Sequence, residues 1–431
     1  MTLEERLRSK NVRVGVLGLG YVGLPLAIEF CREGFHVSGF EVSAARAASI
    51  AKGRSYIEDV ASSELAALVK SGRFKASTDF AGLSACDVVI ICVQTPLRKT
   101  KEPDLGNVVA AAGQAARYLK KGALVVLEST TPPGATQEVV LPQLSKGGRK
   151  PGKDFFLAFS PERVDPGNKF YSIANTPKVI GGIDEASTRA ACALYEHIVE
   201  KVVPVSSARA AEMAKLLENS FRAVNIALVN EMAQICHKLG LDVWEVIAAA
   251  ATKPFGYMPF WPGPGIGGHC IPKDPQLLIW KMKELSYEPR FLQLASGLNS
   301  SMPAYVVDRI AELLNDRGVA LKGSRLFVLG VAYKADTSDY RESPALDVIS
   351  FLMDKGAKIS YHDVHVPVAS WGKRSLKSQA ITQAALSGSD CVLILTQHSG
   401  IDYADVVKRS KMIFDARNAT KGRKAKNVVR L

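Results

Sequence analysis

The sequence predicts a protein of the α/β class, and three observations lead to this prediction. Residues 12–23 run from an apolar strand pattern through a glycine-rich turn into a helical pattern. Residues 324–334 begin a similar succession of apolar strands in the C-terminal third, without the glycine motif. Between them, an amphipathic pattern from about Ser207 to Leu239 is unbroken by glycine or proline. We therefore expect two Rossmann-like doubly wound domains joined by a helical domain with one long central helix.

Length and composition agree with this organisation. The chain has 431 residues, 47% hydrophobic and 23% charged, which are values typical of globular proteins with two or three domains. We place the domain boundaries at 1–203, 204–317 and 318–431. No apolar run is long enough to span a bilayer, and the polar N-terminus leads into a strand, so we expect neither membrane insertion nor a signal peptide.

Charge and cysteine content exclude several classes of partner. The net charge is +13, but basic residues are scattered among acids except in the tail, Lys421 to Lys426, which we interpret as a solvated end. We therefore expect no nucleic-acid partner. The seven cysteines contain no CxxC pair, which predicts reduced thiols in the cytoplasm, without a disulfide framework or a metal site.

The first half carries the pattern of a dinucleotide site. Gly18, Gly20 and Gly23 are spaced as GxGxxG directly after the first strand, where such a turn brings a pyrophosphate to a helix N-terminus. Glu41 ends the next strand about 20 residues later, where an acid binds the adenosine ribose. This order predicts NAD, because the acid would repel the 2′-phosphate of NADP. Arg46 nearby weakens that preference.

Two more apolar strands, at 85–96 and 123–130, place Thr95 and Thr130 at the carboxyl edge of the sheet, near a nicotinamide. Threonines also end strands as helix caps, and for Thr95 the two interpretations carry equal weight. The residues predicted to bind the cofactor are Gly18, Gly20, Tyr21, Val22, Gly23, Glu41, Arg46, Thr95 and Thr130.

The C-terminal third repeats the strand plan with different chemistry. Asp363 takes the place of Glu41. Lys334 lies in the turn after the first strand of this half, and Arg417 follows the last predicted strand. Basic side chains at these edges suit an anionic ligand other than a second dinucleotide.

The helical block places polar residues on an apolar seam. Lys215 and Asn219 are four residues apart, so they share one helix face. A solvated pair is the ordinary alternative to a functional one. The remaining apolar face of this helix suits a homodimer or a higher oligomer.

One loop, GPGIGGHCIPKDP at 263–275, surrounds Cys270 with four glycines and three prolines. Such backbone forms neither helix nor strand and lets other groups approach closely. The thiol is therefore either a loop packing residue or a nucleophile. Asp274 lies four residues further on, and His269 precedes the thiol.

Together these motifs resemble the UDP-glucose/GDP-mannose dehydrogenase family of nucleotide-sugar 6-dehydrogenases over nearly the whole chain. The matching stretches are GVLGLGYVGLPLA, VQTP, ESTTPPG, SPERVDPGN, AEMAKLLENSFRAVNIALVNE, GPGIGGHCIPKDP, LGVAYKADTSDYRESPA and FDARN. The resemblance implies two successive oxidations of a sugar C6 alcohol by NAD. They pass through a cysteine thiohemiacetal and a thioester, which water hydrolyses to a uronic acid.

The resemblance also implies a role for each matching residue. Cys270 is then the nucleophile, Lys215 and Asn219 stabilise the oxyanion, and Asp274 assists the lysine and the water. Glu162 acts as a base in thioester hydrolysis, and Thr130 helps to hold the water. The residues implied to bind the UDP-sugar are Glu162, Arg163, Lys215, Asn219, Tyr257, Gly267, Tyr333, Lys334 and Arg417.

Two departures concern the substrate zone. UDP-glucose members usually carry a glutamate where Pro166 stands, and an arginine in the region where Lys253 is the only nearby cation. The strings PERVDPGN and TKPFGYMPFWPGPG are more similar to the branch that oxidises UDP-N-acetylglucosamine. An N-acetyl group needs an apolar wall, for which the sequence offers aromatic side chains that could equally pack the loop: Phe255, Tyr257, Phe260 and Trp261.

The leading prediction is thus the conversion of UDP-N-acetylglucosamine to UDP-N-acetylglucosaminuronate. The alternatives are the same chemistry on UDP-glucose, UDP-N-acetylmannosamine or UDP-N-acetylgalactosamine, and a single oxidation of a hydroxyacid. A non-catalytic nucleotide-binding regulator is a further alternative, which the joint presence of the lysine, asparagine, cysteine and aspartate disfavours. The sugar epimer and the pathway served stay open.

Overall fold

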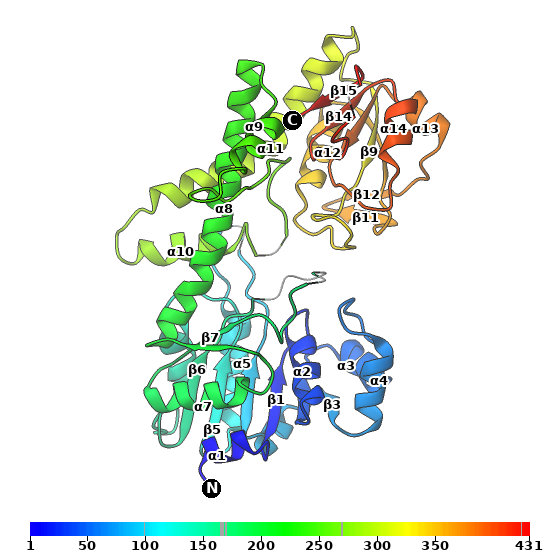
Figure 1. Ribbon diagram of the computed structural model, residues 1–431. Helices are drawn as coiled ribbons and strands as arrows, with labels where there is room; N and C mark the ends of the chain where they lie inside the picture. Colours follow the sequence, from blue (N-terminus) through cyan, green and yellow to red (C-terminus); the bar gives the residue numbers. More distant parts are fainter. Residues whose placement is uncertain (99, 164–167, 169, 269, 424) are drawn as a thin grey trace. The chain divides into compact units, whose positions relative to one another are not determined.

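The computed structural model describes residues 1–98, 100–163, 168, 170–268, 270–423 and 425–431. Pro166, His269 and Lys424, which entered the sequence analysis, lie outside these residues. The chain forms two compact units (Figure 1). Unit 1 comprises residues 1–218 and 276–286, and unit 2 comprises residues 219–275 and 287–431.

Unit 1 is built on an eight-stranded sheet in the order β3-β2-β1-β4-β5-β6-β7-β8. Its strands are β1 (Arg13–Leu17), β2 (His36–Phe40), β3 (Phe74–Ser77), β4 (Val88–Ile91), β5 (Ala123–Leu127), β6 (Phe155–Phe159), β7 (Lys178–Gly182) and β8 (Val202–Pro204). All neighbouring strands are parallel except β6 and β7, which are antiparallel. The central strands are buried on both faces, as their continuous apolar runs predict.

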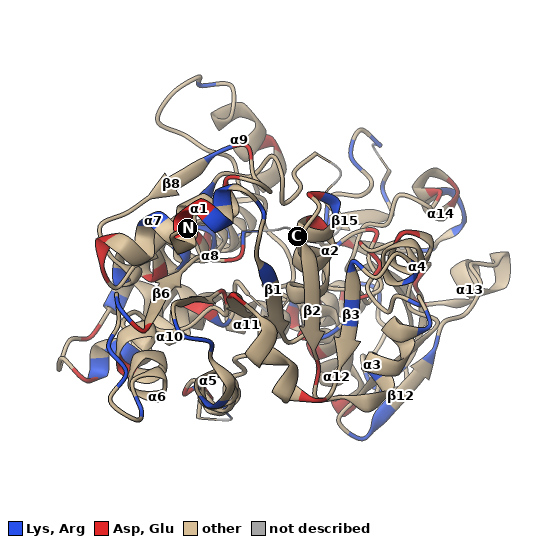
Figure 2. Ribbon diagram, turned by 90° about the horizontal axis from the view of Figure 1, so that it is seen from below, with Lys and Arg blue, Asp and Glu red and all other residues tan. Residues whose placement is uncertain are grey.

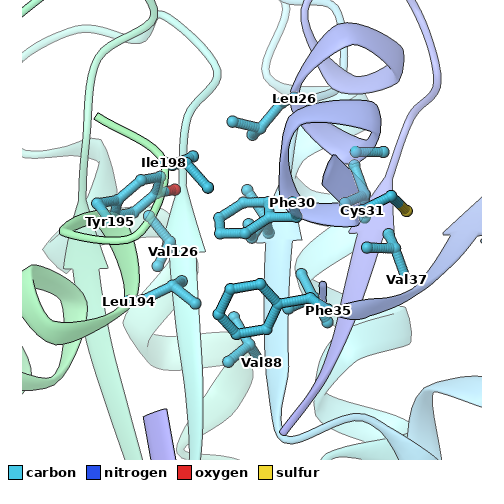
Figure 3. Close-up of a cluster of buried hydrophobic side chains, with 14 of the residues drawn as sticks. Leu26, Phe30, Cys31, Phe35, Val37, Val88, Val126, Leu194, Tyr195 and Ile198 are labelled. Atoms are coloured by element: carbon cyan, nitrogen blue, oxygen red, sulfur yellow. The ribbon is translucent and has the colours of Figure 1, made fainter. Parts of the chain in front are cut away.

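Helices cover both faces of this sheet. They are α1 (Leu3–Arg8), α2 (Gly23–Arg32), α3 (Ala44–Ala51), α4 (Ser62–Lys70), α5 (Gly106–Tyr118), α6 (Leu141–Leu144), α7 (Glu185–Tyr195) and the short turns Phe80–Ala85 and Thr136–Val140. On one face, α1, α2 and α7 enclose the cluster of Figure 3, where Phe30 meets Phe35 edge-on with ring centroids 5.5 Å apart. On the other face, α5, α6 and the start of α8 bury a second cluster.

Two helices contribute residues to both units. Helix α8 (Ala208–Leu239) has 32 residues, which confirms the predicted long helix, and α10 (Asp274–Lys283) is the second. Because α8 contains neither glycine nor proline, its hydrogen-bond ladder continues through the whole span.

Unit 2 contains a five-stranded, fully parallel sheet in the order β10-β9-β13-β14-β15. Its strands are β9 (Arg325–Leu329), β10 (Lys358–His362), β13 (Cys391–Ile394), β14 (Ile413–Asp415) and β15 (Val428–Arg430), with a separate hairpin of β11 (Val368–Trp371) and β12 (Arg374–Lys377). Helices α9 (Val243–Ala250), α11 (Arg290–Asn315) and α12 (Pro344–Asp354) share one core with α8, while α13 (Gln383–Gly388) and α14 (Tyr403–Arg409) cover the other face.

The second Rossmann-like half is therefore confirmed as a parallel α/β sheet that starts at β9. Figure 2 shows basic and acidic residues interspersed over the ribbon, as the sequence indicated. Among the described residues, none of the helices combines the length and the hydropathy that a membrane crossing requires. The boundaries at 1–203, 204–317 and 318–431 stay a prediction, because the compact units divide the chain differently.

Candidate active site

The glycine motif forms the turn between β1 and α2. Gly18 has φ +88°, and a Cβ there would lie 2.8 Å from the carbonyl oxygen of Cys92. At Gly23, the first residue of α2, a Cβ would overlap the carbonyl oxygen of Gly18. Gly20 differs, because a Cβ there would meet nothing within 4 Å. Two glycines thus permit the tight turn, and the third leaves room for a phosphate group at the helix N-terminus.

Glu41 is buried at the carboxyl end of β2 and holds the same turn. Its Oε2 accepts a hydrogen bond from the Leu19 amide at 3.1 Å, and its Oε1 accepts one from the Ser43 amide at 3.1 Å. Arg46, at the start of α3, is exposed and its guanidinium lies 5.4 Å from the ring centroid of Tyr56. The acid therefore stands beside the dinucleotide turn, as the spacing predicted.

The two predicted threonines are in direct contact. The Thr95 hydroxyl donates to the carbonyl oxygen of Thr130 at 2.7 Å. The following loop is fixed by Glu212 of α8, whose carboxylate accepts hydrogen bonds from Gly134 and from Thr136. Thr95 does not cap a helix, since the next helix, α5, begins at Gly106. The pair instead joins the ends of β4 and β5.

Glu162 follows β6 and faces α8. Its Oε2 lies 3.7 Å from Nζ of Lys215, and both side chains are largely buried. The loop around Glu162 is anchored through the next residue, Arg163. Arg163 donates to the Glu218 carboxylate and, at 2.6 Å, to the carbonyl oxygen of Pro177. The guanidinium of Arg163 therefore ties this loop to α8.

A cavity in unit 1 brings predicted cofactor and substrate residues together. It lies between the N-terminal turn of α2 and the loop after β6. Its lining consists of Tyr21, Val22, Pro25, Leu26, Glu128, Pro161, Glu162, Arg163, Ile173, Thr176, Pro177 and Lys178. Among these lining residues, Nζ of Lys178 pairs with the buried carboxylate of Glu128 at 3.0 Å.

The cysteine loop belongs to unit 2. Asn219 donates from Nδ2 to Oδ2 of Asp274 at 2.5 Å, and both side chains are buried. The Asp274 amide donates to the carbonyl oxygen of Cys270 at 2.8 Å, so the first turn of α10 fixes the backbone of the thiol residue. Cys270 is exposed, whereas five of the other six cysteines are buried and Cys192 is half-buried. Three predicted catalytic residues of unit 2 are thus brought together.

Two glycines seat this loop on the turn that carries Tyr333. A Cβ on Gly268, which has φ +85°, would lie 2.8 Å from Cε2 of Tyr333. A Cβ on Gly267 would lie 2.8 Å from Cβ of the same tyrosine. The absence of side chains on these glycines lets the backbone of the loop contact the aromatic ring directly.

A second cavity lies at the carboxyl ends of β9, β13 and β14. Tyr333, Lys334 and Arg417 line it, together with Ala335, Asp336, Thr396, Gln397 and Ser399. Arg417 donates from Nε to the carbonyl oxygen of Leu395 at 3.0 Å. Burial lowers the pKa of its guanidinium to about 10, so the side chain is a cation at neutral pH. The cavity suits an anionic ligand with a flat ring.

The four aromatic residues before the cysteine loop divide into two groups. Trp261 stacks on Trp244 with ring centroids 5.7 Å apart, and Phe260 meets Phe221 edge-on at 5.8 Å. Phe255 and Tyr257 are exposed. Packing thus accounts for two of the four aromatic residues, while Phe255 and Tyr257 are open to water.

Sequence reasoning missed Glu212, Glu218 and His398. The first two lie on α8 near Lys215, where they hold the loops after β5 and β6. The sequence feature that could have indicated them is the recurrence of polar residues along the apolar face of one helix. His398 is fully buried just after β13, and a histidine at the carboxyl end of a buried strand was its signal.

Comparison with known proteins identifies the family. The three models of the UDP-glucose/GDP-mannose dehydrogenase family match residues 12–199 (NAD binding domain), 209–301 (central domain) and 327–422 (UDP binding domain). UDP-N-acetyl-D-mannosamine dehydrogenase of Pyrococcus horikoshii is 35% identical over 95% of this chain and 96% of its own length. UDP-N-acetyl-D-glucosamine 6-dehydrogenase of Pseudomonas aeruginosa is 36% identical over 82% of this chain and 83% of its own length.

Solved structures agree with these matches. The structure of UDP-D-ManNAc dehydrogenase from Pyrococcus horikoshii has a TM-score of 0.88 at 33% identity, over 97% of this chain and 98% of the other. The predicted cofactor is confirmed, because the first matching domain is the NAD binding domain of the family. The chain therefore belongs to the UDP-glucose/GDP-mannose dehydrogenase family and is an NAD-dependent UDP-sugar dehydrogenase, an oxidoreductase that acts on a CH–OH group.

Proposed function

We propose that the enzyme oxidises the C6 alcohol of a UDP-N-acetylhexosamine to the carboxylate, with Cys270 as the nucleophile. The observation that carries this proposal is the exposed thiol of Cys270 on a loop seated against Tyr333. Packing does not explain an exposed cysteine in backbone that approaches a nucleotide-binding turn so closely. A reactive thiol also requires a reducing compartment, which favours the cytoplasm.

The chemistry follows from the residues in unit 2. The thiolate of Cys270 adds to the C6 aldehyde, so that a C–S bond forms, the C=O π bond breaks and the oxygen takes up a proton to become a hydroxyl. Loss of a hydride from this carbon and of the hydroxyl proton gives a thioester, and attack of water then breaks the C–S bond, which releases the acid and the Cys270 thiolate. NAD, when bound, accepts the hydride of each oxidation. The amide of Asn219, oriented by Asp274, would donate to the developing oxyanion.

The residues of unit 1 supply the proton transfers. Lys215 and Glu162 are 3.7 Å apart, so a cation and a carboxylate are available as a coupled acid and base. We assign the stabilisation of alkoxide charge to Lys215 and the activation of water to Glu162. Thr130 presents a hydroxyl beside Thr95 at the end of β5, which suits a role in holding this water.

The nucleotide part of the substrate is assigned to the second cavity. Lys334 and Arg417 would bind the diphosphate as cations, and Tyr333 would contact the uracil ring. Gly267 would offer backbone to the sugar, and Tyr257 an aromatic surface to its N-acetyl group. Arg163 donates to the Glu218 carboxylate and so orders the loop after β6. We assign to Arg163 a role in binding the sugar through this loop.

UDP-N-acetylglucosamine is the first substrate candidate, and UDP-N-acetylmannosamine is the second. The relative that matches 95% of this chain bears the name of a UDP-N-acetylmannosamine enzyme, while the glucosamine enzyme matches 82% at similar identity. Both sugars carry the N-acetyl group. The similarity to protein CapL of Staphylococcus aureus supports our proposal of a role in polysaccharide biosynthesis.

A homodimer through α8 is the proposed assembly. Phe221, Leu228, Ile235 and Leu239 on this helix are 46%, 52%, 41% and 66% exposed. The first three follow each other at intervals of seven, so they form one stripe along the helix. A stripe of large apolar side chains open to water favours burial against a second copy of the chain.

The test is the amount of NADH formed per sugar consumed, with UDP-N-acetylglucosamine, UDP-N-acetylmannosamine and UDP-glucose run side by side. We expect two NADH per N-acetylated sugar and little turnover of UDP-glucose. Cys270→Ala should abolish acid formation, while Cys192→Ala, at the half-buried cysteine of α7, should not. One NADH per sugar, or unchanged acid output from Cys270→Ala, would refute the thioester route. No turnover of any sugar would favour the non-catalytic alternative.

A further inference from the structure

The buried pair of Asp363 and His398 lies beneath the turn that carries Tyr333 and Lys334. Asp363 follows β10 and His398 follows β13, so both stand at the carboxyl edge of the second sheet. Nε2 of His398 lies 3.0 Å from Oδ2 of Asp363, and neither side chain is exposed to water.

Asp363 holds the first part of the turn. Its Oδ2 accepts hydrogen bonds from the amides of Val331 at 2.7 Å and Ala332 at 3.1 Å. Its Oδ1 accepts from the amides of His365 and Val366 at 2.8 and 3.0 Å. The carboxylate thereby joins the end of β9 to the segment after β10.

His398 holds the last part of the turn. The amide of Asp336 donates to Nδ1 of His398 at 3.0 Å, so the other ring nitrogen carries the proton and donates to Asp363. The Asp336 carboxylate in turn accepts from the Ser399 amide at 2.8 Å. Tyr333 and Lys334 therefore lie between two fixed points, one on each side.

The same position in unit 1 serves a different purpose. Glu41 also accepts a hydrogen bond from a backbone amide of the first turn, that of Leu19. This turn, however, contains Gly20, where a Cβ would meet nothing within 4 Å, and it faces a dinucleotide. In unit 2, the imidazole of His398 is bonded to Asp363 instead. A metal ion is also disfavoured there, because the Nδ1 lone pair of His398 already accepts the Asp336 amide.

We propose that Asp363 and His398 are positioning residues for UDP binding, which preset the turn so that Tyr333 and Lys334 meet the nucleotide without rearrangement. This inference rests on the proposed nucleotide site. A preset turn loses less conformational freedom when UDP binds, so UDP should bind with higher affinity. Substitution of His398 leaves the Asp336 amide without an acceptor and releases one end of the turn.

The experiment measures UDP and NAD binding by calorimetry on full-length variants. His398→Phe should weaken UDP binding about tenfold or more, because the part-buried hydrogen bond that holds the Asp336 amide is lost and UDP must then order the turn. The NAD affinity should stay unchanged. His398→Asn, which keeps an acceptor near the Nδ1 position, should recover part of the loss. In steady-state kinetics, KM for the UDP-sugar should rise while kcat stays within about twofold, since this residue does not touch the reacting atoms.

Two controls separate the possible failures. Asp390→Asn removes a carboxylate that accepts the Arg325 amide at 2.7 Å at the opposite edge of the same sheet, and it should leave UDP binding unchanged. Lys334→Ala tests the nucleotide site itself. If Lys334→Ala weakens UDP binding and His398→Phe does not, the positioning role is refuted. If neither variant weakens it, the proposed nucleotide site is refuted.

A measurement on the unsubstituted enzyme covers the case in which the His398 variants do not fold. Hydrogen exchange of the peptide 329–337 should be slow before UDP is added, because the amides of Val331, Ala332 and Asp336 are already bonded. Rapid exchange that slows only with UDP would mean that the nucleotide orders the turn, and it would overturn the proposal.

Discussion

Lys215 of α8 and Glu162 of the loop after β6 form a largely buried ion pair, with Nζ and Oε2 3.7 Å apart. Burial makes each charge dependent on the other, since an unpaired charge in this position would be poorly solvated. The loop is held independently by Arg163 and Glu218, so loss of the pair should leave the loop in place. Substitutions of the two residues should therefore report on chemistry.

Glu162→Gln should block hydrolysis more than oxidation. We expect a burst of NADH followed by steady turnover reduced about 100-fold or more, the usual scale of a lost general base. Intact-mass measurement after the burst should find the sugar acyl group on Cys270. Glu185→Gln, an exposed acid at the start of α7, serves as the control. If Glu162→Gln keeps the full steady-state rate, Glu162 is not the base that activates water.

Lys215→Met should abolish the burst as well. A lysine that stabilises alkoxide charge acts in the first oxidation, and removal of such a group costs about 100-fold to 1,000-fold in kcat. Rapid-mixing absorbance at the NADH band measures the first turnover. A normal burst in this variant would limit the role of the lysine to the later steps.

Gly268→Ala should impair the enzyme through the contact with Tyr333. The new methyl group would lie 2.8 Å from the ring, and overpacking of this kind changes energies by about 1–3 kcal/mol. We expect kcat/KM for the UDP-sugar to fall about tenfold or more. Gly240→Ala is the matched control, because its φ is also positive, at +69°, and its Cβ meets nothing within 4 Å. Equal losses in both variants would assign the effect to backbone strain alone.

Asp363 should make unit 2 sensitive to acid. Burial raises the pKa of this carboxyl, but the hydrogen bonds from His398 and from backbone amides outweigh it and lower the pKa from 3.8 to about 2. The group therefore stabilises the fold above pH 4, and this contribution of about 2 kcal/mol is lost as the pH falls from 4 to 2. Denaturant unfolding at several pH values measures it. Asp363→Asn should flatten the slope in this interval, and an unchanged slope would contradict the assignment.

Leu228→Glu should separate the proposed dimer. The substitution places a charge in the middle of the exposed stripe on α8, where burial against a second copy would leave it unpaired. Light scattering after size-exclusion chromatography should show half the mass of the unsubstituted protein. Val368→Glu, at an exposed position of β11, should leave the mass unchanged. A monomeric unsubstituted protein would refute the interface.

Much of the fold was predictable because its signals are local. The strands β1, β2, β4 and β5 are short apolar runs, and the turn at Gly18 is encoded by glycine spacing. The direction of β7 was not predictable, because a strand that runs antiparallel to its neighbour has the same period. The long helix was predictable from the uninterrupted pattern that ends at Leu239.

The environment of the site was less accessible to sequence reasoning. The resemblance suggested Cys270, Lys215 and Asn219, but not that Gly268 seats the thiol loop on a ring 65 positions away. Contacts at such separation leave no periodic trace in the sequence. Thr95 was weighed equally as a helix cap and as a site residue, and its bond to the Thr130 carbonyl depends on the pairing of β4 with β5.

The distribution of thiols should allow selective chemical labelling of this enzyme. All seven cysteines are described, none forms a disulfide, and Cys270 is the exposed one. Burial also raises the pKa of several others, among them Cys31 and Cys391, both to about 12. A mild alkylating reagent should therefore modify one position in the native protein and several after denaturation. A fluorophore or crosslinker can thus be attached at Cys270 without prior removal of the other cysteines.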